Sequence, residues 1–229
     1  MKRLLDWRLL AALLVFIFGM TVTSCGEDDE VKPNTVQDPD LTNPDGGMAV
    51  DLGLPTGTLW ADRNIGAECP EDYGNYFAWG ETTPKNTYDW STYKWCNGTK
   101  DSQTKYCTIS RNGTVDNLTI LEPEDDAATA NWGDRWRMPT SLEFEELLTY
   151  CTWEWTTQNN VIGYKVAGRN GNSIFLPAHL KVVSSVYWSK SLGELQSYGA
   201  WGLEIRHAYC GMFDYISRDA GCTVRAVVK

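Results

Sequence analysis

The sequence predicts an α+β domain of short, twisted antiparallel strands with one or two helices and long loops. Short runs in which apolar and polar residues alternate recur along the chain, as half-buried strands require. One stretch, residues 140–151, carries apolar residues at helical spacing. Residues 82–131 are polar, dense in turn residues and without helical period. A connection this long usually marks a functional or disulfide-stapled segment.

The first part of the domain predicts a hairpin and a buried strand. Apolar residues alternate over 50–54, and residues 55–57, Pro-Thr-Gly, supply a turn before a second extended run at 59–65. The run Tyr-Phe-Ala-Trp at 76–79 is typical of a short buried strand.

The helix is predicted by its start signal and its apolar stripe. Thr140 and Glu143 form a T-x-x-E capping box, in which each side chain satisfies a backbone donor of the other residue. Apolar side chains then fall on one helix face at Phe144, Leu147, Leu148 and Cys151.

The C-terminal half predicts several more strands. Asn170-Gly171 favours a tight turn between runs at 163–166 and 173–176. Further strands are expected at 186–189, 200–210 and 222–228. Apolar residues at 201, 203 and 205 alternate with Gly202, Glu204 and Arg206, which predicts one buried and one solvated face.

The N-terminus predicts export and lipidation. Basic residues lead into an uncharged run from Leu9 to Met20, and small residues then precede Cys25, which is the order of a secretory signal peptide. The tetrapeptide ending at Cys25 resembles the lipobox of bacterial lipoproteins. A transmembrane anchor is the alternative, but Thr21 interrupts the apolar run before the roughly 20 residues that a span needs. We expect a lipoprotein signal peptide at 1–24 and membrane attachment through a lipid on Cys25.

Residues 25–48 predict an acidic flexible tether. They are rich in Asp, Glu and Pro and nearly devoid of large apolar residues, so they bury too little surface to fold. Residues 26–30, Gly-Glu-Asp-Asp-Glu, resemble the acidic tag that sends lipoproteins to the outer face of the outer membrane in Bacteroidetes-type bacteria. An ordinary solvated linker is the alternative. The chain has a net charge of −10, which argues against nucleic acid as a partner. Residues 49–229 have the length of one domain.

The cysteines of the domain predict disulfides. An even number in an exported domain favours pairing. Cys96 with Cys107 and Cys210 with Cys222 each enclose a short loop, which leaves Cys69 with Cys151, although other connectivities remain open. With two histidines in the chain and no C-x-x-C pair, we expect no metal and no cofactor.

Several stretches resemble the Fibrobacter succinogenes major paralogous domain family. The resemblance lies in residues 50–61, 76–82, 136–140, 187–189 and 223–227, in that order along the chain. It implies a C-type-lectin-like fold, distantly related to formylglycine-generating enzymes, in which the N- and C-terminal strands pair. The chain departs from the family at Thr223 and Ala226, where relatives have Ser and Pro, and in a shorter segment after Ala178.

The resemblance also implies a ligand-binding surface between the Tyr-Trp-Ser motif and the final Val-Arg. Relatives used as diversified binding proteins vary there. The mixture of aromatic and charged side chains in this part of the chain is typical of a protein-binding surface. The expected ligand is an extracellular protein or glycan. The positions are Glu194, Gln196, Tyr198, Gly202, Glu204, Arg206, His207, Tyr209, Phe213, Asp214 and Tyr215, with 212–215 taken as a loop.

Other functions find less support in the residues. Formylglycine-generating relatives need two closely spaced reactive cysteines, whereas Cys210 and Cys222 are twelve positions apart. The acidic run at 122–126 offers oxygen atoms for calcium, but it lacks the motifs of sugar-binding members and is expected to be a solvated loop. We therefore expect a binding protein and not an enzyme. An extracellular carbohydrate-active or protein-modifying enzyme and a structural envelope protein are the alternatives.

Overall fold

The computed structural model describes residues 47–179 and 185–228. The expected signal peptide, Cys25 and nearly all of the tether lie outside these residues, as does most of the segment after Ala178. No helix within the described ranges is both long enough and apolar enough to cross a bilayer.

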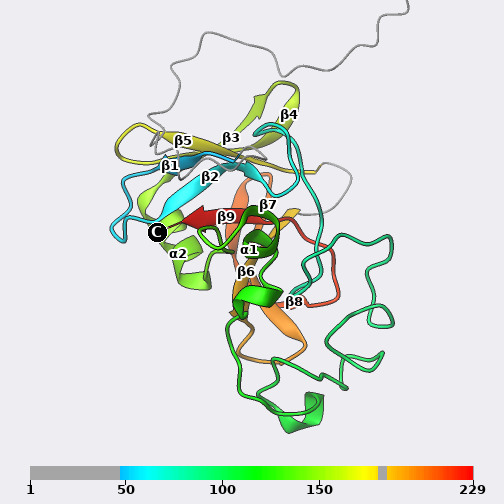
Figure 1. Cartoon of the computed structure of the whole chain (residues 1–229). Helices are drawn as coiled ribbons and strands as arrows, with labels where there is room; N and C mark the ends of the chain where they lie inside the picture. Colours follow the sequence, from blue (N-terminus) through cyan, green and yellow to red (C-terminus); the bar gives the residue numbers. More distant parts are fainter. Residues whose placement is uncertain (1–46, 180–184, 229) are drawn as a thin grey trace, which may run out of the picture.

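The described residues form three small antiparallel sheets with few helices, which confirms the α+β prediction (Figure 1). The first sheet has the order β1-β2-β9, from Ala49–Asp51, Leu59–Asn64 and Arg225–Val228. The second has the order β3-β4-β5, from Thr152–Gln158, Val161–Ala167 and Ser173–Pro177. The third has the order β6-β7-β8, from Ser185–Leu192, Gly199–Arg206 and Tyr209–Ser217.

The first sheet joins the two ends of the domain. The predicted hairpin is confirmed, since Val50 lies opposite Trp60 across β1 and β2. Val227 of β9 lies opposite Trp60 on the other side, so the last strand closes against the first hairpin. The strand predicted at 76–79 is wrong, because this segment makes only one isolated bridge, from Phe77 to Cys222. Its apolar residues are nevertheless buried, and the Trp79 indole N–H donates to the carbonyl of Ser189 at 2.8 Å.

Helix α2 (Ser141–Tyr150) confirms the capping box. The Thr140 hydroxyl accepts from the backbone N–H of Glu143, and the Glu143 carboxylate accepts from the backbone N–H of Thr140. Both Nη atoms of Arg137 also donate to Glu143, at 2.5 and 2.7 Å. Burial acts to raise the pKa of Glu143, but the hydrogen bonds from Arg137 and Thr140 outweigh it and lower the pKa to about 2.

Two strands of the C-terminal half differ from the prediction. The Asn170-Gly171 hairpin between β4 and β5 is confirmed. Strand β3, which pairs with β4 and carries Trp153 and Trp155, follows the helix directly and was not predicted. The run 200–210 is not one strand. It turns at His207 and Ala208, where Ala208 has a φ of 60°, and β8 then covers the segment predicted as a loop at 212–215.

The third sheet lies between two apolar cores. Tyr187, Leu203 and Ile205 belong to the core that contains Phe144 of α2. Trp188 belongs to the other core, which also contains the buried aromatic residues Phe77, Trp79 and Tyr106.

The excursion at 82–131 has little regular structure and is held by buried charge. It contains the 3-10 turns η2 (Ser110–Asn112) and η3 (Pro123–Asp125) and the short helix α1 (Ala127–Trp132). Arg218, fully buried, donates to the Tyr93 hydroxyl at 2.8 Å and to the backbone carbonyls of Tyr106 and Lys105 at 3.0 Å. These contacts join the excursion to the end of the third sheet.

Candidate functional site

The predicted ligand-binding residues extend along the third sheet. They belong to β7, to β8, to the turn between them and to the loop between β6 and β7. Tyr198 precedes the first residue of β7 and Arg206 is its last, so eight residues of extended chain, roughly 25 Å, separate them. The predicted residues therefore spread along the sheet, as a group on the β7–β8 hairpin that reaches Tyr215 beside Gly199, and a second group on the β6–β7 loop.

The hairpin group contains a continuous strip of side chains, which we call the aromatic strip: Arg206, Tyr209, Phe213 and Tyr215. The Arg206 guanidinium lies 4.8 Å from the centre of the Tyr209 ring. The Tyr209 and Phe213 ring centres are 6.1 Å apart, and those of Phe213 and Tyr215 are 5.4 Å apart. Tyr215 is 58% exposed. Each neighbour in the strip thus contacts the next, and its two ends, Arg206 and Tyr215, are exposed while Tyr209 and Phe213 are half-buried.

A β-bulge produces the end of the strip. Ala200 lies opposite Ile216 and Gly202 opposite Phe213, so Asp214 and Tyr215 together oppose the single residue Trp201. Phe213 and Tyr215 are two positions apart, the spacing that places strand side chains on one face, and their rings remain in contact beside the bulge. No local motif predicts this bulge.

Gly202 is a correction to the predicted surface. It is buried, because Val186 and Ile216 cover its position, and a Cβ added there would lie 2.6 Å from the Ile216 side chain. Glu204, opposite Gly211, is half-buried. His207 is exposed at the hairpin turn, where its ring lies 5.6 Å from that of Trp155 in an edge-to-face contact.

The second group faces the excursion. Gln196 accepts from Arg111 at 3.1 Å. The Tyr198 ring lies 6.5 Å from that of Trp90 and 5.0 Å from the Lys100 Nζ. Glu194 is exposed on the same loop. Sequence reasoning missed the excursion partners, since they are about a hundred positions away and carry no local motif.

The described cysteines correct the disulfide prediction. Cys96, Cys107, Cys151, Cys210 and Cys222 are thiols, so none of the three expected pairs forms. The Cys96 thiol donates to the Trp90 carbonyl and the Cys107 thiol to that of Ile109. Cys210 packs against one core and Cys222 lies within the other, which explains why this pair does not meet.

Three of these thiols, Cys151, Cys210 and Cys222, are also poor nucleophiles. Burial raises the pKa of Cys151 to about 11 and raises those of Cys210 and Cys222 as well. A thiol becomes reactive when its pKa is lowered, usually by a nearby positive charge.

The acidic run at 122–126 is another correction, because part of it is buried. Asp125 pairs with Lys94 at 3.1 Å and with Lys105 at 2.7 Å. Asp126 caps helix α1 by accepting from the backbone N–H groups of Ala128 and Thr129. These carboxylates are thus used to hold the excursion. Across the described residues, no group of three His, Cys, Asp or Glu side chains has the arrangement of a metal site.

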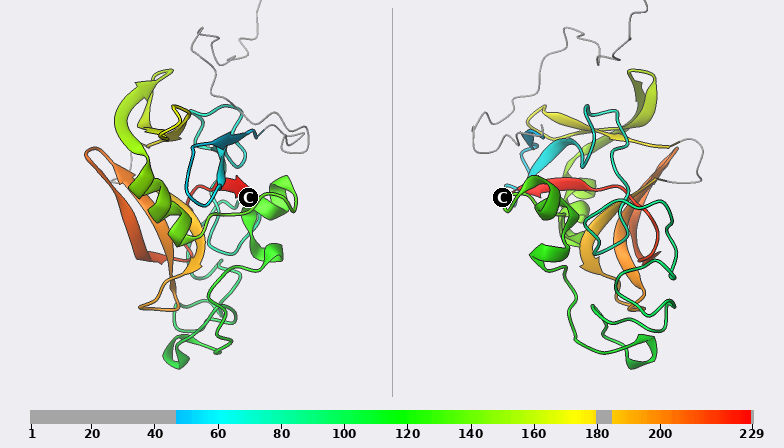
Figure 2. Two further views of the ribbon diagram at one scale, coloured as in Figure 1. Left: turned by 90° about the vertical axis from the view of Figure 1, so that its left-hand side faces the viewer. Right: turned by 45° about the vertical axis from the view of Figure 1, so that its right-hand side comes forward.

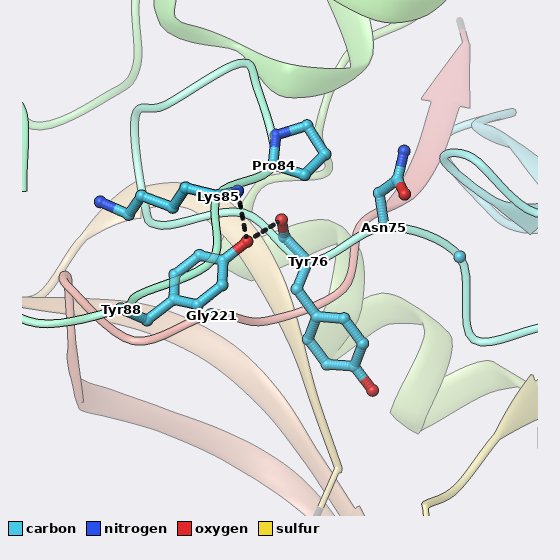
Figure 3. Close-up of a pocket in the computed structure, with 7 residues that line it drawn as sticks. Asn75, Tyr76, Pro84, Lys85, Tyr88 and Gly221 are labelled. Carbon is cyan, nitrogen blue, oxygen red and sulfur yellow. Dashed lines mark hydrogen bonds between the residues drawn. The ribbon is translucent and has the colours of Figure 1, made fainter.

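A shallow pocket of about 470 Å³ lies apart from the predicted surface (Figure 3). The Tyr88 hydroxyl links its walls, donating to the Tyr76 carbonyl at 2.5 Å and accepting from the Lys85 backbone N–H at 3.2 Å. The Lys85 ammonium points away and donates to Glu81 at 2.9 Å, so it does not serve a ligand in the pocket. The lining residues are Gly74, Asn75, Tyr76, Pro84, Lys85, Tyr88 and Gly221.

Comparison of the chain with known protein families, with curated proteins and with solved structures finds no match in any of the three. The geometry of the aromatic strip therefore carries the functional argument.

Proposed function

We propose that this protein is a lipid-anchored lipoprotein of the outer surface of a bacterial outer membrane, which presents a C-type-lectin-like domain as a binding module. The lipid on Cys25 and the acidic tether follow from the sequence of the first 48 residues. The fold proposal is supported by the pairing of the last strand with the first hairpin, as the resemblance implies.

The aromatic strip is the observation that carries the binding function. Large aromatic side chains and arginine are the residues that contribute most to protein interfaces, because they bury much area and lose little conformational freedom. The strip places three aromatic rings of β8 and one guanidinium of β7 in contact on a paired hairpin, which holds their backbone in place. A surface ordered before binding costs less entropy when the ligand arrives.

The ring orientations favour a protein ligand over a glycan. The Tyr209 and Phe213 rings are inclined at 56°, and those of Phe213 and Tyr215 at 87°. Sugar rings stack on flat aromatic faces, and steeply inclined rings offer no common plane. An uneven surface with a positive charge at one end suits the side chains of an extracellular protein.

Protein and glycan arrays test this proposal. The probe is the chain from Gly26 onward, which contains every described residue, compared with a variant that carries Arg206→Ala and Tyr215→Ala. Leu195→Ala is the matched control, because Leu195 is 64% exposed on the β6–β7 loop outside the strip. We expect a protein hit that the double variant weakens at least about tenfold and the control leaves unchanged. A hit weakened only by Leu195→Ala would reject the strip, and a glycan hit would reject a protein ligand.

A further inference from the structure

Strand β8 is an edge strand, and the residues described beside it leave its outer edge open. In the order β6-β7-β8 its one strand partner is β7. Among the described residues, the backbone of 210–216 makes no hydrogen bond outside that pairing. Unpaired N–H and C=O groups on an edge strand are a template for another strand. Figure 2 shows the β7–β8 hairpin standing at one side of the molecule.

The register of the hairpin identifies the backbone groups that face outward. Arg206 and Tyr209 flank the two-residue turn, so they form a hydrogen-bonded pair. Bonded and non-bonded pairs alternate along an antiparallel ladder. Tyr209, Gly211 and Phe213 therefore bond to β7, and the N–H and C=O groups of Cys210 and Met212 point to the open edge.

The sequence along this edge is nearly symmetric. Residues 209–213 read Tyr-Cys-Gly-Met-Phe, with an aromatic residue at each end, a sulfur-containing residue inside each end and glycine at the centre. A two-fold interface requires a surface that complements itself. Here the nearly symmetric segment is also the open edge of the sheet.

We propose that two copies of the chain pair antiparallel along β8, with the two-fold axis at Gly211. Cys210 of one copy then exchanges two backbone hydrogen bonds with Met212 of the other, and the same pair repeats across the axis. Tyr209 of each copy lies opposite Phe213 of the other in a non-bonded pair, where side chains approach closely. The two glycines face each other at the axis, where the absence of side chains permits close approach.

Charge supports the same register. Continuing the pairing beyond Tyr209 brings Ala208 of the β7–β8 turn opposite Asp214 of the other copy, and Arg206 is the β7 residue that borders this turn. Arg206 is exposed and Asp214 is half-buried at the bulge. Opposite charges therefore meet at both ends of the interface. The bulge at Asp214 and Tyr215 also ends the regular edge, which limits the pairing to a short segment and predicts a dimer that dissociates on dilution.

The dimer would join two three-stranded sheets into one and place the two aromatic strips side by side. The pairing needs no ligand, so it stands or fails independently of the proposed binding function.

Cross-linking provides the decisive test. In a Cys210→Ser background, Gly211→Cys would place two cysteines directly opposite each other across the axis. Non-bonded pairs have Cα atoms about 4.5 Å apart, within the range that a disulfide spans. A Cβ at 211 meets only the mobile end of Tyr209, so the variant is expected to fold. The control is Leu142→Cys in the same background, because Leu142 is 71% exposed on α2.

We expect mild oxidation of the chain from Gly26 onward to convert the Gly211→Cys variant to a covalent dimer at least tenfold faster than the control. Equal rates would overturn the proposal. Sedimentation equilibrium gives a second measurement, in which Gly211→Lys should abolish a concentration-dependent dimer through like-charge repulsion at the axis. The matched Leu142→Lys variant should retain the dimer. A dimer that survives Gly211→Lys would assign the interface elsewhere.

Discussion

Replacing Arg218 with methionine should cost this protein about a fifth or more of its stability. The Arg218 guanidinium is fully buried and donates to four acceptors: the Tyr93 hydroxyl and the carbonyls of Ser197, Tyr106 and Lys105, at 2.6 to 3.0 Å. Its carbon atom also lies 4.9 Å from the Trp79 ring centre. No carboxylate forms a salt bridge with it among the described residues.

The expected magnitude follows from two opposing contributions. Four hydrogen bonds to a charged donor are worth about 1.5–3 kcal/mol each, a gross loss of about 6–12 kcal/mol. Removing the buried cation recovers several kcal/mol of desolvation cost. The net loss is about 3–5 kcal/mol, against a total of about 5–15 kcal/mol for a typical domain.

Urea unfolding followed by tryptophan fluorescence measures this loss. Arg206→Met is the matched control, since Arg206 also lies over a tyrosine ring but is exposed, and it should cost within about 1 kcal/mol. Arg218→Lys should be intermediate, because an ammonium keeps the charge but has fewer donors than the guanidinium fork. Hydrogen exchange at the excursion should accelerate in both Arg218 variants. If Arg218→Met loses no more than Arg206→Met, the excursion is not held by this cation.

Three further results are expected. The Glu143 carboxylate, whose pKa is lowered from 4.5 to about 2, should contribute up to about 3 kcal/mol above pH 5 that is lost as the pH falls toward 2. Glu143→Gln should flatten that part of the urea-midpoint profile, and an unchanged profile would contradict this role. Gly113→Ala should cost more than about 2 kcal/mol of stability, because the new Cβ would lie 2.1 Å from the Gln103 carbonyl oxygen. The control Gly98→Ala, whose Cβ would meet nothing within 4 Å, should cost about 1 kcal/mol. Equal shifts of the melting temperature in the two variants would contradict the clash at Gly113. Alkylation after unfolding without reductant should label Cys96, Cys107, Cys151, Cys210 and Cys222 in the mass spectrum. A pair of these that stays unlabelled would restore a disulfide.

The sequence by itself determined the elements whose signals are local. The hairpin of β1 and β2, the capped start of α2 and the Asn170-Gly171 turn each depend on residues within a few positions of one another. Short-range hydrogen bonds and steric preferences specify such elements without help from the rest of the chain. The alternation along β7 also correctly predicted that Leu203 and Ile205 are buried.

Only the tertiary structure decided what the polar and sulfur-containing residues do. The acidic run around Asp125 predicts a solvated loop, but the Asp125 side chain is buried and forms salt bridges with Lys94 and Lys105. Cys210 and Cys222 are close in sequence, yet Cys210 packs against one core and Cys222 lies in the other. The bulge at Asp214 and Tyr215 likewise depends on the register with β7. A buried polar group is satisfied by whichever partner the fold brings within about 3 Å, and that partner can be a hundred residues away.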